Sequence, residues 1–390
     1  MEISPAQRIE RLPANFFSSL GTKIAQIQAS GGDVIRLDVG SPDLPPAPHI
    51  IEALARSASA PDRHGYQPHK GSLALRAAWA EMYRRVYGVE LDPESEILPL
   101  LGSKEGVFHM MLAWVEPGDI VMIPDPGYIT YTSGTRFAGG EPYYLPLRPE
   151  MDFLPDLKSI PEDIANRAKV LWLNYPNNPT AAVVSAGFFE DVIAFARQYH
   201  LLVCHDAAYT QVTFDGYQAP SILSIPGAKD VAVEFNTLSK SHNMAGWRVG
   251  AALGNSQALK ALYSLKTNAD SSHFLPVLEA ATLAMTADQT WLAERNQEYC
   301  RRRDVVLQAL HKIGLHAAKP SASLYVWSPV PSGWSSLEFA SALLDETQVS
   351  LTPGTVFGEG GEGYVRIALT APTPRVAEAM DRISRSRIFA

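Results

Sequence analysis

Cysteine is scarce in this sequence, and it has no long apolar runs. Only Cys204 and Cys300 occur among 390 residues, which is too few for a disulfide framework, and no Cys/His cluster stands at zinc spacing around either. No apolar run approaches the roughly 18 residues that a membrane-spanning helix needs, and the N-terminal stretch MEISPAQRIERLP lacks the apolar core of a signal peptide. We therefore expect a soluble cytoplasmic protein without a metal site.

Clusters of basic residues are also missing. The formal net charge is -8, the isoelectric point is about 5.7, and no Lys/Arg-rich run stands out, so nucleic acid and anionic membranes are poor partners. With 46% hydrophobic and 19% charged residues, the chain has an ordinary globular composition. Its length allows two domains with a cleft for a small-molecule partner.

From Ile97 onward, apolar strand-like runs alternate with helical segments such as KEGVFHMMLAWV and FFEDVIAFARQY. This alternation predicts an α/β fold with a parallel sheet that is covered on both faces. A helical region from about Phe274 through Leu310 then leads to a second lobe with strands LYVWSPV and GYVRIAL. The predicted strands of the sheet are LLGS, DIVMIPDPGY, KVLWLNYPNNPT, LLVCHDAAY, DVAVEFNTLSK and VGAALGN.

Polar side chains follow these strands directly. Functional residues of such sheets gather beyond the carboxyl ends of the strands, so this edge is the predicted site. The residues placed there by the pattern are Tyr128, Asn178, Asp206, Tyr209 and Lys240.

The stretch NTLSKSHNMAGWRVG contains the first candidate for covalent chemistry. Lys240 lies among hydroxyl residues that include Thr237 and Ser239, and Arg248 follows eight residues later. A partly buried lysine can react with an aldehyde while nearby donors hold an anionic group. The alternative is a solvated lysine in a serine-rich loop.

Three further segments carry candidate binding groups, two of which allow a structural interpretation as well. Ser103 and Lys104 in GSKEG offer an anion site at a helix N-terminus, or Ser103 is an ordinary N-cap. Asp206 at the end of LLVC needs a cation, such as a protonated pyridine nitrogen. Arg366 inside the apolar strand GYVRIAL binds a substrate carboxylate or forms a structural salt bridge.

Two other patterns carry little weight. In CHDAAY, neighbouring strand residues point to opposite faces, which argues against a cysteine nucleophile or a metal site at Cys204. GEGGEG, residues 358–363, matches a dinucleotide-binding pattern but precedes a strand, so we interpret it as a loop.

Taken together, SKSHNMAGWR, DAAY, NNPT, DPGY and YQPHKG resemble the motifs of the class I/II aminotransferases, which have pyridoxal phosphate fold type I. The segments occur in the family's order across nearly the whole chain. The resemblance implies a large domain with a mostly parallel seven-stranded sheet flanked by helices, and a smaller α/β domain from the N- and C-terminal segments. The implied ranges are 1–40 for an arm and helix packed on the small domain, 41–285 for the large domain and 286–390 for the small domain.

The resemblance also implies the cofactor, pyridoxal 5'-phosphate, and a homodimer with sites at the subunit interface. Lys240, Asp206 and Tyr209 become the catalytic residues, where Asp206 pairs with the pyridinium nitrogen and Tyr209 holds the ring oxygen together with Asn178. The ring stacks on Tyr128. The implied phosphate contacts are Ser103, Lys104, Thr237, Ser239 and Arg248, with Tyr66 from the other subunit. The implied substrate contacts are Arg366, Gly40, Asn178, Asn15 and Asn268.

The implied reaction is a ping-pong transfer of an amino group between an α-amino acid and a 2-oxo acid. Runs such as LLGSKEG, AGGEPYYLPL and CHDAAYTQVTFDGYQAPS look most like LL-diaminopimelate aminotransferases, which suggests LL-diaminopimelate with 2-oxoglutarate and a role in lysine biosynthesis. The chain departs from that group near the expected substrate end. The departures are Asn15, Ile129, Ala181, His242, Ser272 and His273.

Other functions remain open at this stage. A β-lyase or related eliminase shares the scaffold and the lysine, and aminotransferases for aspartate, glutamate, alanine or aromatic amino acids share the reaction. A ligand-sensing domain of a regulator is a non-enzymatic alternative, but it needs an added DNA-binding module, and the catalytic fold takes up about 390 residues.

Overall fold

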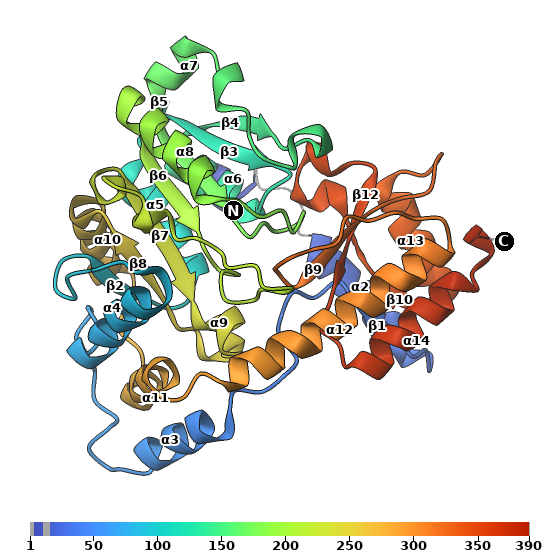
Figure 1. Cartoon of the computed structure of the whole chain (residues 1–390), viewed down its shortest axis with the longest axis horizontal. Coiled ribbons are helices and arrows are strands. Elements are labelled where there is room, and N and C mark those ends of the chain that lie inside the picture. The colour runs from blue at the N-terminus through green and yellow to red at the C-terminus, as the bar shows by residue number, and fades with distance from the viewer. Residues whose placement is uncertain (1–3, 11–15, 390) are drawn as a thin grey trace.

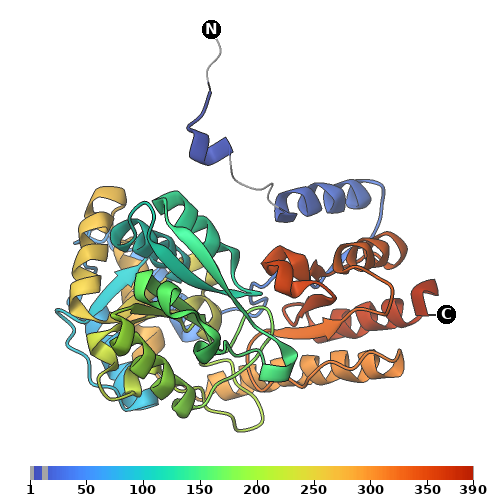
Figure 2. The same cartoon turned by 90° about the horizontal axis from the view of Figure 1, so that it is seen from above.

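The computed structural model describes residues 4–10 and 16–389. Two lobes are visible in Figure 1, one built on a seven-stranded sheet and the other on a small antiparallel sheet that carries the C-terminal elements. Helix α2 (Phe16–Ala29) lies against the second lobe, as Figure 2 shows. Its buried Leu20 and Ile24 pack with Val34 and Leu344, so the start of the chain contributes to the C-terminal lobe.

The larger sheet has the strand order β2-β8-β7-β6-β5-β3-β4. Only β8 runs against its neighbours, because it pairs antiparallel with both β7 and β2 while the other pairs are parallel. The expected fold class, a mostly parallel seven-stranded sheet, is therefore confirmed. The strands are β2 (Ile97–Leu100), β3 (Ile120–Asp125), β4 (Glu141–Pro146), β5 (Ala168–Asn174), β6 (Leu202–Asp206), β7 (Ala232–Thr237) and β8 (Gly250–Gly254).

One strand of this sheet escaped the sequence pattern. Strand β4 lies at the sheet edge and contains Pro142 and Pro146, which cannot donate to a ladder and are typical of edge strands. Most of its residues are exposed or half-buried, so it lacks the apolar run by which the other strands are recognised.

Helices cover both faces of the sheet. Buried residues of α5, α6 and α10 pack on one face around Trp172 and Phe235, and those of α3, α4, α7, α8 and α11 pack in a second cluster around Leu171 and Val203. The helices are α3 (Pro48–Ala58), α4 (Leu73–Tyr87), α5 (Ser103–Trp114), α6 (Ile129–Ala138), α7 (Glu162–Arg167), α8 (Ala186–Tyr199), α10 (Ser256–Ala269) and α11 (Leu275–Thr286).

Local signals explain where several helices begin and end. Ser72 caps α4 by accepting a hydrogen bond from the Leu75 backbone, and Gly88 ends it in the left-handed region at φ 67°. Helix α3 follows the proline-rich loop that the sequence indicates, with Pro48 at its first position, where no intrahelical donor is needed.

The second lobe forms its own buried cluster, which includes Leu324, Phe339 and Met380. Its three-stranded sheet has the order β11-β12-β9, and β1 pairs with β10 in parallel, which ties the N-terminal segment to this lobe. The elements are β1 (Ile35–Arg36), β9 (Tyr325–Pro329), β10 (Val349–Ser350), β11 (Thr352–Pro353), β12 (Tyr364–Ala368), α12 (Trp291–Lys312), α13 (Ser336–Thr347) and α14 (Thr373–Ser384).

The long helical region expected from Phe274 to Leu310 is two helices. Helix α11 ends at Thr286 and α12 begins at Trp291, with Gln289 bonded to the backbone carbonyls of Ala284 and Ala287 in the break. Figure 1 shows α12 running from beside α9 (Leu238–Ser241) into the C-terminal lobe. The division of the chain at residues 40 and 285 stays a prediction.

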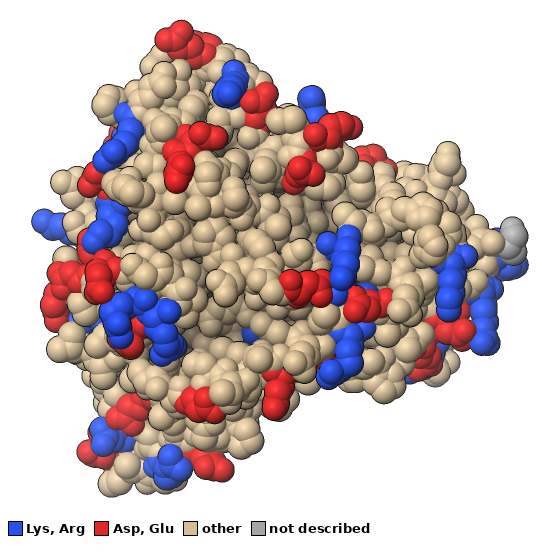
Figure 3. Space-filling view, in the orientation of Figure 1, with Lys and Arg blue, Asp and Glu red and all other residues tan. Residues whose placement is uncertain are grey.

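The surface view adds two observations. On the face shown in Figure 3, acidic and basic side chains are interspersed around a hollow between the lobes, without a continuous patch of one sign. Within residues 4–10 and 16–389, no helix combines the length and the apolar character that crossing a membrane takes.

A buried polar network fixes the centre of the sheet. Glu234 on β7 is fully buried, and its carboxylate accepts hydrogen bonds from Tyr83 (2.7 Å), Ser221 (2.9 Å) and the Ile222 backbone (3.0 Å). His205 on the neighbouring strand β6 places Nδ1 2.9 Å from Glu234 Oε2. A buried carboxylate is tolerated only with this full set of partners.

We predict that Glu234→Ala lowers the free energy of unfolding by about 3–5 kcal/mol, the usual cost of removing one partner from a buried pair. Urea unfolding measures the change. As a control, Glu81→Ala removes the exposed acid that pairs with Arg84 on α4 and should leave the unfolding midpoint nearly unchanged. Equal midpoint shifts for the two variants would contradict a structural role for the network.

Candidate active site

A cavity of about 490 Å³ lies at the carboxyl ends of the sheet strands and is closed by residues of the second lobe. Its volume is in the range of small-molecule and cofactor sites. Twelve of the residues expected from the sequence line it. They are Gly40, Ser103, Lys104, Tyr128, Asn178, Asp206, Tyr209, Thr237, Ser239, Lys240, Arg248 and Arg366.

Lys240 lies on α9, a single helical turn between β7 and β8. Thr237 caps this turn by accepting from the Ser239 backbone at 3.1 Å, so the strand passes directly into the helix. The Lys240 ammonium donates to the Gly40 carbonyl across the cavity. Burial lowers the pKa of Lys240, and the nearby Arg366 and Arg248 act in the same direction, which increases the fraction of neutral amine.

Arg295 holds the backbone that carries Lys240. This buried guanidinium on α12 donates to the carbonyl of Lys240 at 2.9 Å and to the carbonyl of Ser241. It also donates to the Gln211 carbonyl at 2.8 Å. Burial lowers the pKa of Arg295 to about 10, and none of the acids that the structure describes pairs with it. The helix that joins the lobes therefore also positions the lysine.

Asp206 ends β6 and is buried at the bottom of the cavity. Oδ2 accepts from the Tyr131 hydroxyl at 2.9 Å, whereas Oδ1 is buried and has no partner among the described residues. Burial raises the pKa of this carboxyl group, and the Tyr131 hydrogen bond opposes the rise. A cation placed against Oδ1 would satisfy the free oxygen and favour the charged form.

A set of donors at the start of α5 suits an anion. The N-cap is Gly102 and no side chain caps it, so the N–H groups of Ser103 and its neighbours stay free for a ligand. The exposed guanidinium of Arg248 comes so close to Gly102 that a Cβ there would overlap it. The geometry therefore favours the anion site over an ordinary serine N-cap.

Arg366 on β12 has no acidic partner among the described residues. Its guanidinium donates to Asn178 Oδ1 at 2.9 Å and to the Asp38 carbonyl at 2.7 Å. It lies between the rings of Tyr325 and Phe357, with Cζ 4.3 and 4.7 Å from their centroids. Of the two interpretations of Arg366, the structural salt bridge is absent, and a charge that can receive a carboxylate remains.

Two tyrosines and a glycine close the site near Lys240. The hydroxyl groups of Tyr209 and Tyr325 lie 2.8 Å apart. Gly40 has no room for a side chain, because a Cβ would overlap the Tyr325 hydroxyl. The backbone of Gly40, an expected substrate contact, thus closely approaches Tyr325, a residue that belongs to no motif.

Two of the expected site residues are not brought to this cavity, and a third is not described by the structure. Asn268 is exposed on α10 and donates to the Ser264 carbonyl. Tyr66 is 95% exposed, and its expected role across a subunit interface needs a second chain. Asn15 lies outside the described residues.

The departures from the LL-diaminopimelate group also lie outside the cavity lining, as far as the structure describes them. His242 is buried between Ser241 and Gln289, and burial lowers its pKa to about 3, so it is neutral. His273 bonds to the Arg248 carbonyl at 2.7 Å. Ala181 adopts φ 59°, a conformation that favours the glycine it replaces. Ile129 and Ser272 are likewise not in the lining.

Several residues of the site were missed by sequence reasoning. Tyr131 follows Tyr128 by one helical turn, so its position on α6 could have been recognised. Asn174 donates to the Asp206 carbonyl at 2.7 Å and accepts from the Asn178 backbone. Tyr325 and Arg295 come from distant elements of the second lobe, and Arg36 and Asp38 come from the N-terminal segment. No motif pointed to any of these four.

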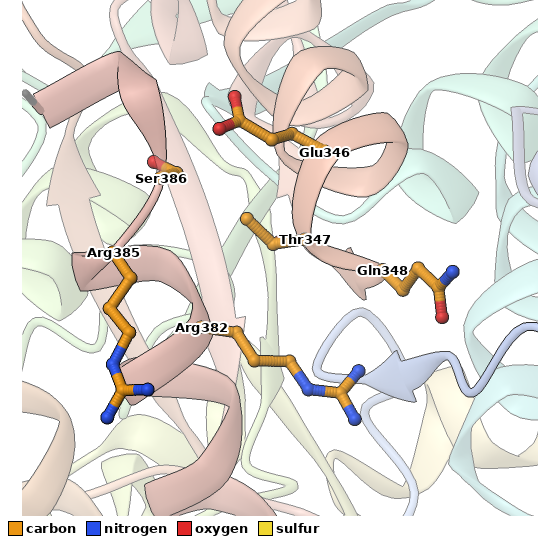
Figure 4. Close-up of a pocket in the computed structure, with 6 residues that line it drawn as sticks. All are labelled: Glu346, Thr347, Gln348, Arg382, Arg385 and Ser386. Atoms are coloured by element: carbon orange, nitrogen blue, oxygen red, sulfur yellow. The ribbon is translucent and has the colours of Figure 1, made fainter.

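Two other clusters carry no catalytic geometry. Glu105, His109 and Asp270 lie close enough to hold a metal ion, but Lys266 Nζ is 2.7 Å from Asp270 Oδ1 and 3.6 Å from Glu105 Oε1, so the ammonium supplies the positive charge. A hollow of about 290 Å³ lies between the ends of α13 and α14. Its charged side chains point in different directions (Figure 4), and its arginines are paired with acids.

Comparison with known proteins identifies the family. The model of the family "Aminotransferase class I and II" matches residues 32–383. The chain is 48% identical over 380 residues to an LL-diaminopimelate aminotransferase of Moorella thermoacetica, covering 97% of both chains. A protein of the same name from Syntrophobacter fumaroxidans is 48% identical over 385 residues, 99% of both.

Solved structures agree with this assignment. BacF from Bacillus subtilis has a TM-score of 0.95 at 35% identity, over 99% of this chain and 98% of BacF. An aspartate aminotransferase double mutant from Thermus thermophilus has a TM-score of 0.91 at 28% identity, over 98% and 100% of the two chains. The chain belongs to the class I and II aminotransferases and is an aminotransferase, as its motifs predict.

Proposed function

We propose that this aminotransferase uses pyridoxal 5'-phosphate and moves an amino group between an α-amino acid and a 2-oxo acid in a ping-pong reaction. The observation that carries the proposal is the buried, unpartnered Oδ1 of Asp206 in the same cavity as a lysine of lowered pKa. A protonated pyridine nitrogen supplies the cation that this oxygen lacks, and an aldehyde supplies a partner for the amine.

The other lining residues fit the remaining parts of the cofactor. Tyr128 offers a ring face, Tyr209 a hydroxyl group and Asn178 an amide for the ring oxygen. Because Asn178 Oδ1 accepts from Arg366, its NH₂ group is left to donate. The residues for the phosphate are Ser103, Lys104, Thr237, Ser239 and Arg248.

When bound, the cofactor supplies a ring that accepts the electron pair left when the Cα–H bond of the substrate breaks. Asp206 keeps the proton on the ring nitrogen, which preserves this capacity. With the cofactor in place, Lys240 Nζ would accept the proton from the substrate Cα as a general base and then give it up as a general acid. Arg366 binds the substrate α-carboxylate and orients Cα toward Lys240.

We propose LL-diaminopimelate as amino donor and 2-oxoglutarate as acceptor, because several relatives at 44–48% identity carry the name LL-diaminopimelate aminotransferase. Lysine biosynthesis is then the role of the reaction. Transfer from aspartate, glutamate, alanine or aromatic amino acids is the alternative.

A donor screen tests this function. Each amino acid is added to the holoenzyme without an oxo acid, and conversion of the cofactor to its amino form is followed by absorbance. We expect conversion by LL-diaminopimelate, with an equal amount of oxo acid released. Formation of ammonia and pyruvate by repeated turnover without an added oxo acid would show elimination instead.

We further propose a cytoplasmic homodimer. Tyr66, Leu73, Phe274 and Ile51 are exposed apolar side chains, and α11, which Phe274 precedes, packs against α3 and α4, which carry Ile51 and Leu73. Exposed apolar groups on neighbouring elements favour cover by a second copy. Tyr66 would then reach the phosphate of the partner's site. Both cysteines are free, as is usual in a reducing compartment.

We predict that Lys240→Ala lowers turnover by about 10⁴-fold, because the variant has no base for the Cα proton. Borohydride treatment followed by mass spectrometry should leave no cofactor covalently bound to the variant. Lys260→Ala, an exposed position on α10, is the control for loss of a lysine. A borohydride-stable adduct in Lys240→Ala would show that another residue binds the aldehyde.

Asp206→Asn should lower kcat by about 10²- to 10³-fold, since a neutral amide cannot hold the pyridinium proton. Burial raises the pKa of Asp206 in the folded protein above its pKa in the unfolded chain. At any pH above the unfolded-state pKa, the cost of ionising this buried carboxyl group therefore destabilises the cofactor-free fold. At pH 7 the amide removes this cost, and we expect the cofactor-free variant to melt no lower than the parent. Near-normal turnover, or a large drop in Tm, would mark Asp206 as structural.

A further inference from the structure

A second arginine lines the same cavity as Lys240 and Arg366. Arg36 on β1 belongs to the N-terminal segment, and its strand pairs with β10 of the second lobe. No motif includes Arg36, and none of the cofactor contacts proposed above uses it.

The orientation of Arg36 is fixed by one acid. Arg36 Nε donates to Asp38 Oδ1 at 3.0 Å, and Nη2 donates to Asp38 Oδ2 at 2.5 Å. The Asp38 side chain is completely buried, while that of Arg36 is 39% exposed. This bidentate contact uses one edge of the guanidinium, and Nη1 on the other side has no hydrogen-bond partner among the described residues.

Asp38 also sets the distance between the two arginines. Its backbone carbonyl accepts from Arg366 Nη2 at 2.7 Å and from Thr352 Oγ1 at 3.2 Å, while its carboxylate holds Arg36. A single residue of the N-terminal segment therefore places two guanidinium groups at fixed positions in one cavity wall.

The charges of the lining leave Arg36 without an assigned ligand. Arg248 and Lys104 suit the phosphate, Lys240 the aldehyde and Arg366 the α-carboxylate. Of the acids in the described lining, Asp206 suits the ring nitrogen, and Asp38 is already taken by Arg36. The basic residues of the lining are Arg36, Lys104, Lys240, Arg248 and Arg366.

The geometry points to Arg36 as the specificity-determining residue that receives the distal carboxylate of the substrates, with Asp38 as its positioning residue. This inference rests on the proposed function of the cavity. A planar fork with a free edge matches a carboxylate, and the buried, fully bonded Asp38 offers nothing to a distal ammonium. In a ping-pong reaction the amino donor and the oxo acid occupy the cavity in turn, so one arginine serves both.

The two substrates proposed above, LL-diaminopimelate and 2-oxoglutarate, each carry a second carboxylate beyond the reacting end, and Arg36 is the residue assigned to it. The alternative role for Arg36 is a purely structural ion pair with Asp38. A structural pair would affect all substrates equally, whereas a distal contact affects only those with a second carboxylate.

The test compares matched substrates in the holoenzyme. For Arg36→Gln we expect kcat/KM with glutamate and 2-oxoglutarate to fall about 10- to 100-fold, mainly because KM rises. With alanine and pyruvate, which lack the second carboxylate, we expect kcat/KM to fall less than about threefold. Arg36→Lys should recover part of the loss, because it keeps the charge but not the fork. Equal losses for both substrate pairs, with Tm unchanged, would overturn the inference.

Binding gives a readout that does not depend on turnover. By calorimetry, glutarate should bind the parent holoenzyme more tightly than valerate, which has the same number of carbons and one carboxylate, and Arg36→Gln should remove the difference. An unchanged preference for glutarate would refute the role of Arg36. Absence of transamination in the parent protein together with an Arg36-dependent preference for glutarate would refute the proposed function but keep the distal contact.

Two further variants separate folding from binding. Arg36→Gln leaves the buried carboxylate of Asp38 without a positive partner. The double variant Arg36→Gln/Asp38→Asn removes both charges of the pair, so no unpaired charge stays buried in the cavity wall. We expect this double variant to show the same selective loss with a parental Tm. Arg84→Gln removes an exposed arginine that holds Glu81 by a similar bidentate contact, and should leave both substrate pairs unaffected.

Discussion

Buried charge without a counter-charge is the constraint around which this molecule is built. Asp206 and Arg366 are buried, Lys240 is partly buried, and none of the three has an ion-pair partner among the described residues. Hydroxyl, carbonyl and amide groups hold them instead. Other buried arginines are paired with acids, as Arg302 with Asp43 and Arg303 with Asp215 show, whereas Arg295 is held by backbone carbonyls next to Lys240. The cavity is thus the place where the fold keeps unmatched charges for ligands.

Keeping these charges apart requires support from both lobes. Strands β6 and β7 deliver Asp206 and Lys240 to one edge of the sheet, where short connections hold them. Arg366, Tyr325 and Arg295 come from elements beyond residue 290, and Asp38 from the N-terminal segment. The site is therefore a product of the contact between lobes, and a rigid position of α12 relative to α9 is needed to place Lys240.

The sheet and the site residues at its edge could be predicted from local sequence. Residues of the sheet edge, such as Asp206 and Lys240, were found because apolar strands end where polar residues begin, and the family resemblance ordered them. Tyr325 and Arg295 could not be found this way, since their partners Tyr209 and Ser241 are 116 and 54 positions away. The sequence also could not decide between a salt bridge and a ligand site at Arg366. That decision requires knowing which groups surround the guanidinium, and these come from distant parts of the chain.

The proposed role of Arg36 puts a determinant of specificity at a position that is not among the departures from the family resemblance. The positions at which the sequence departs from its resemblance, such as His242 and Ala181, serve local packing and backbone geometry outside the cavity lining. The segment that carries Arg36 and Asp38, in contrast, lines the same cavity as Lys240. Because β1 pairs with β10 of the second lobe, any movement between the lobes also moves this wall relative to Lys240. The substrate selection proposed for Arg36 therefore depends on the contact between the two lobes, as the position of Lys240 does through Arg295.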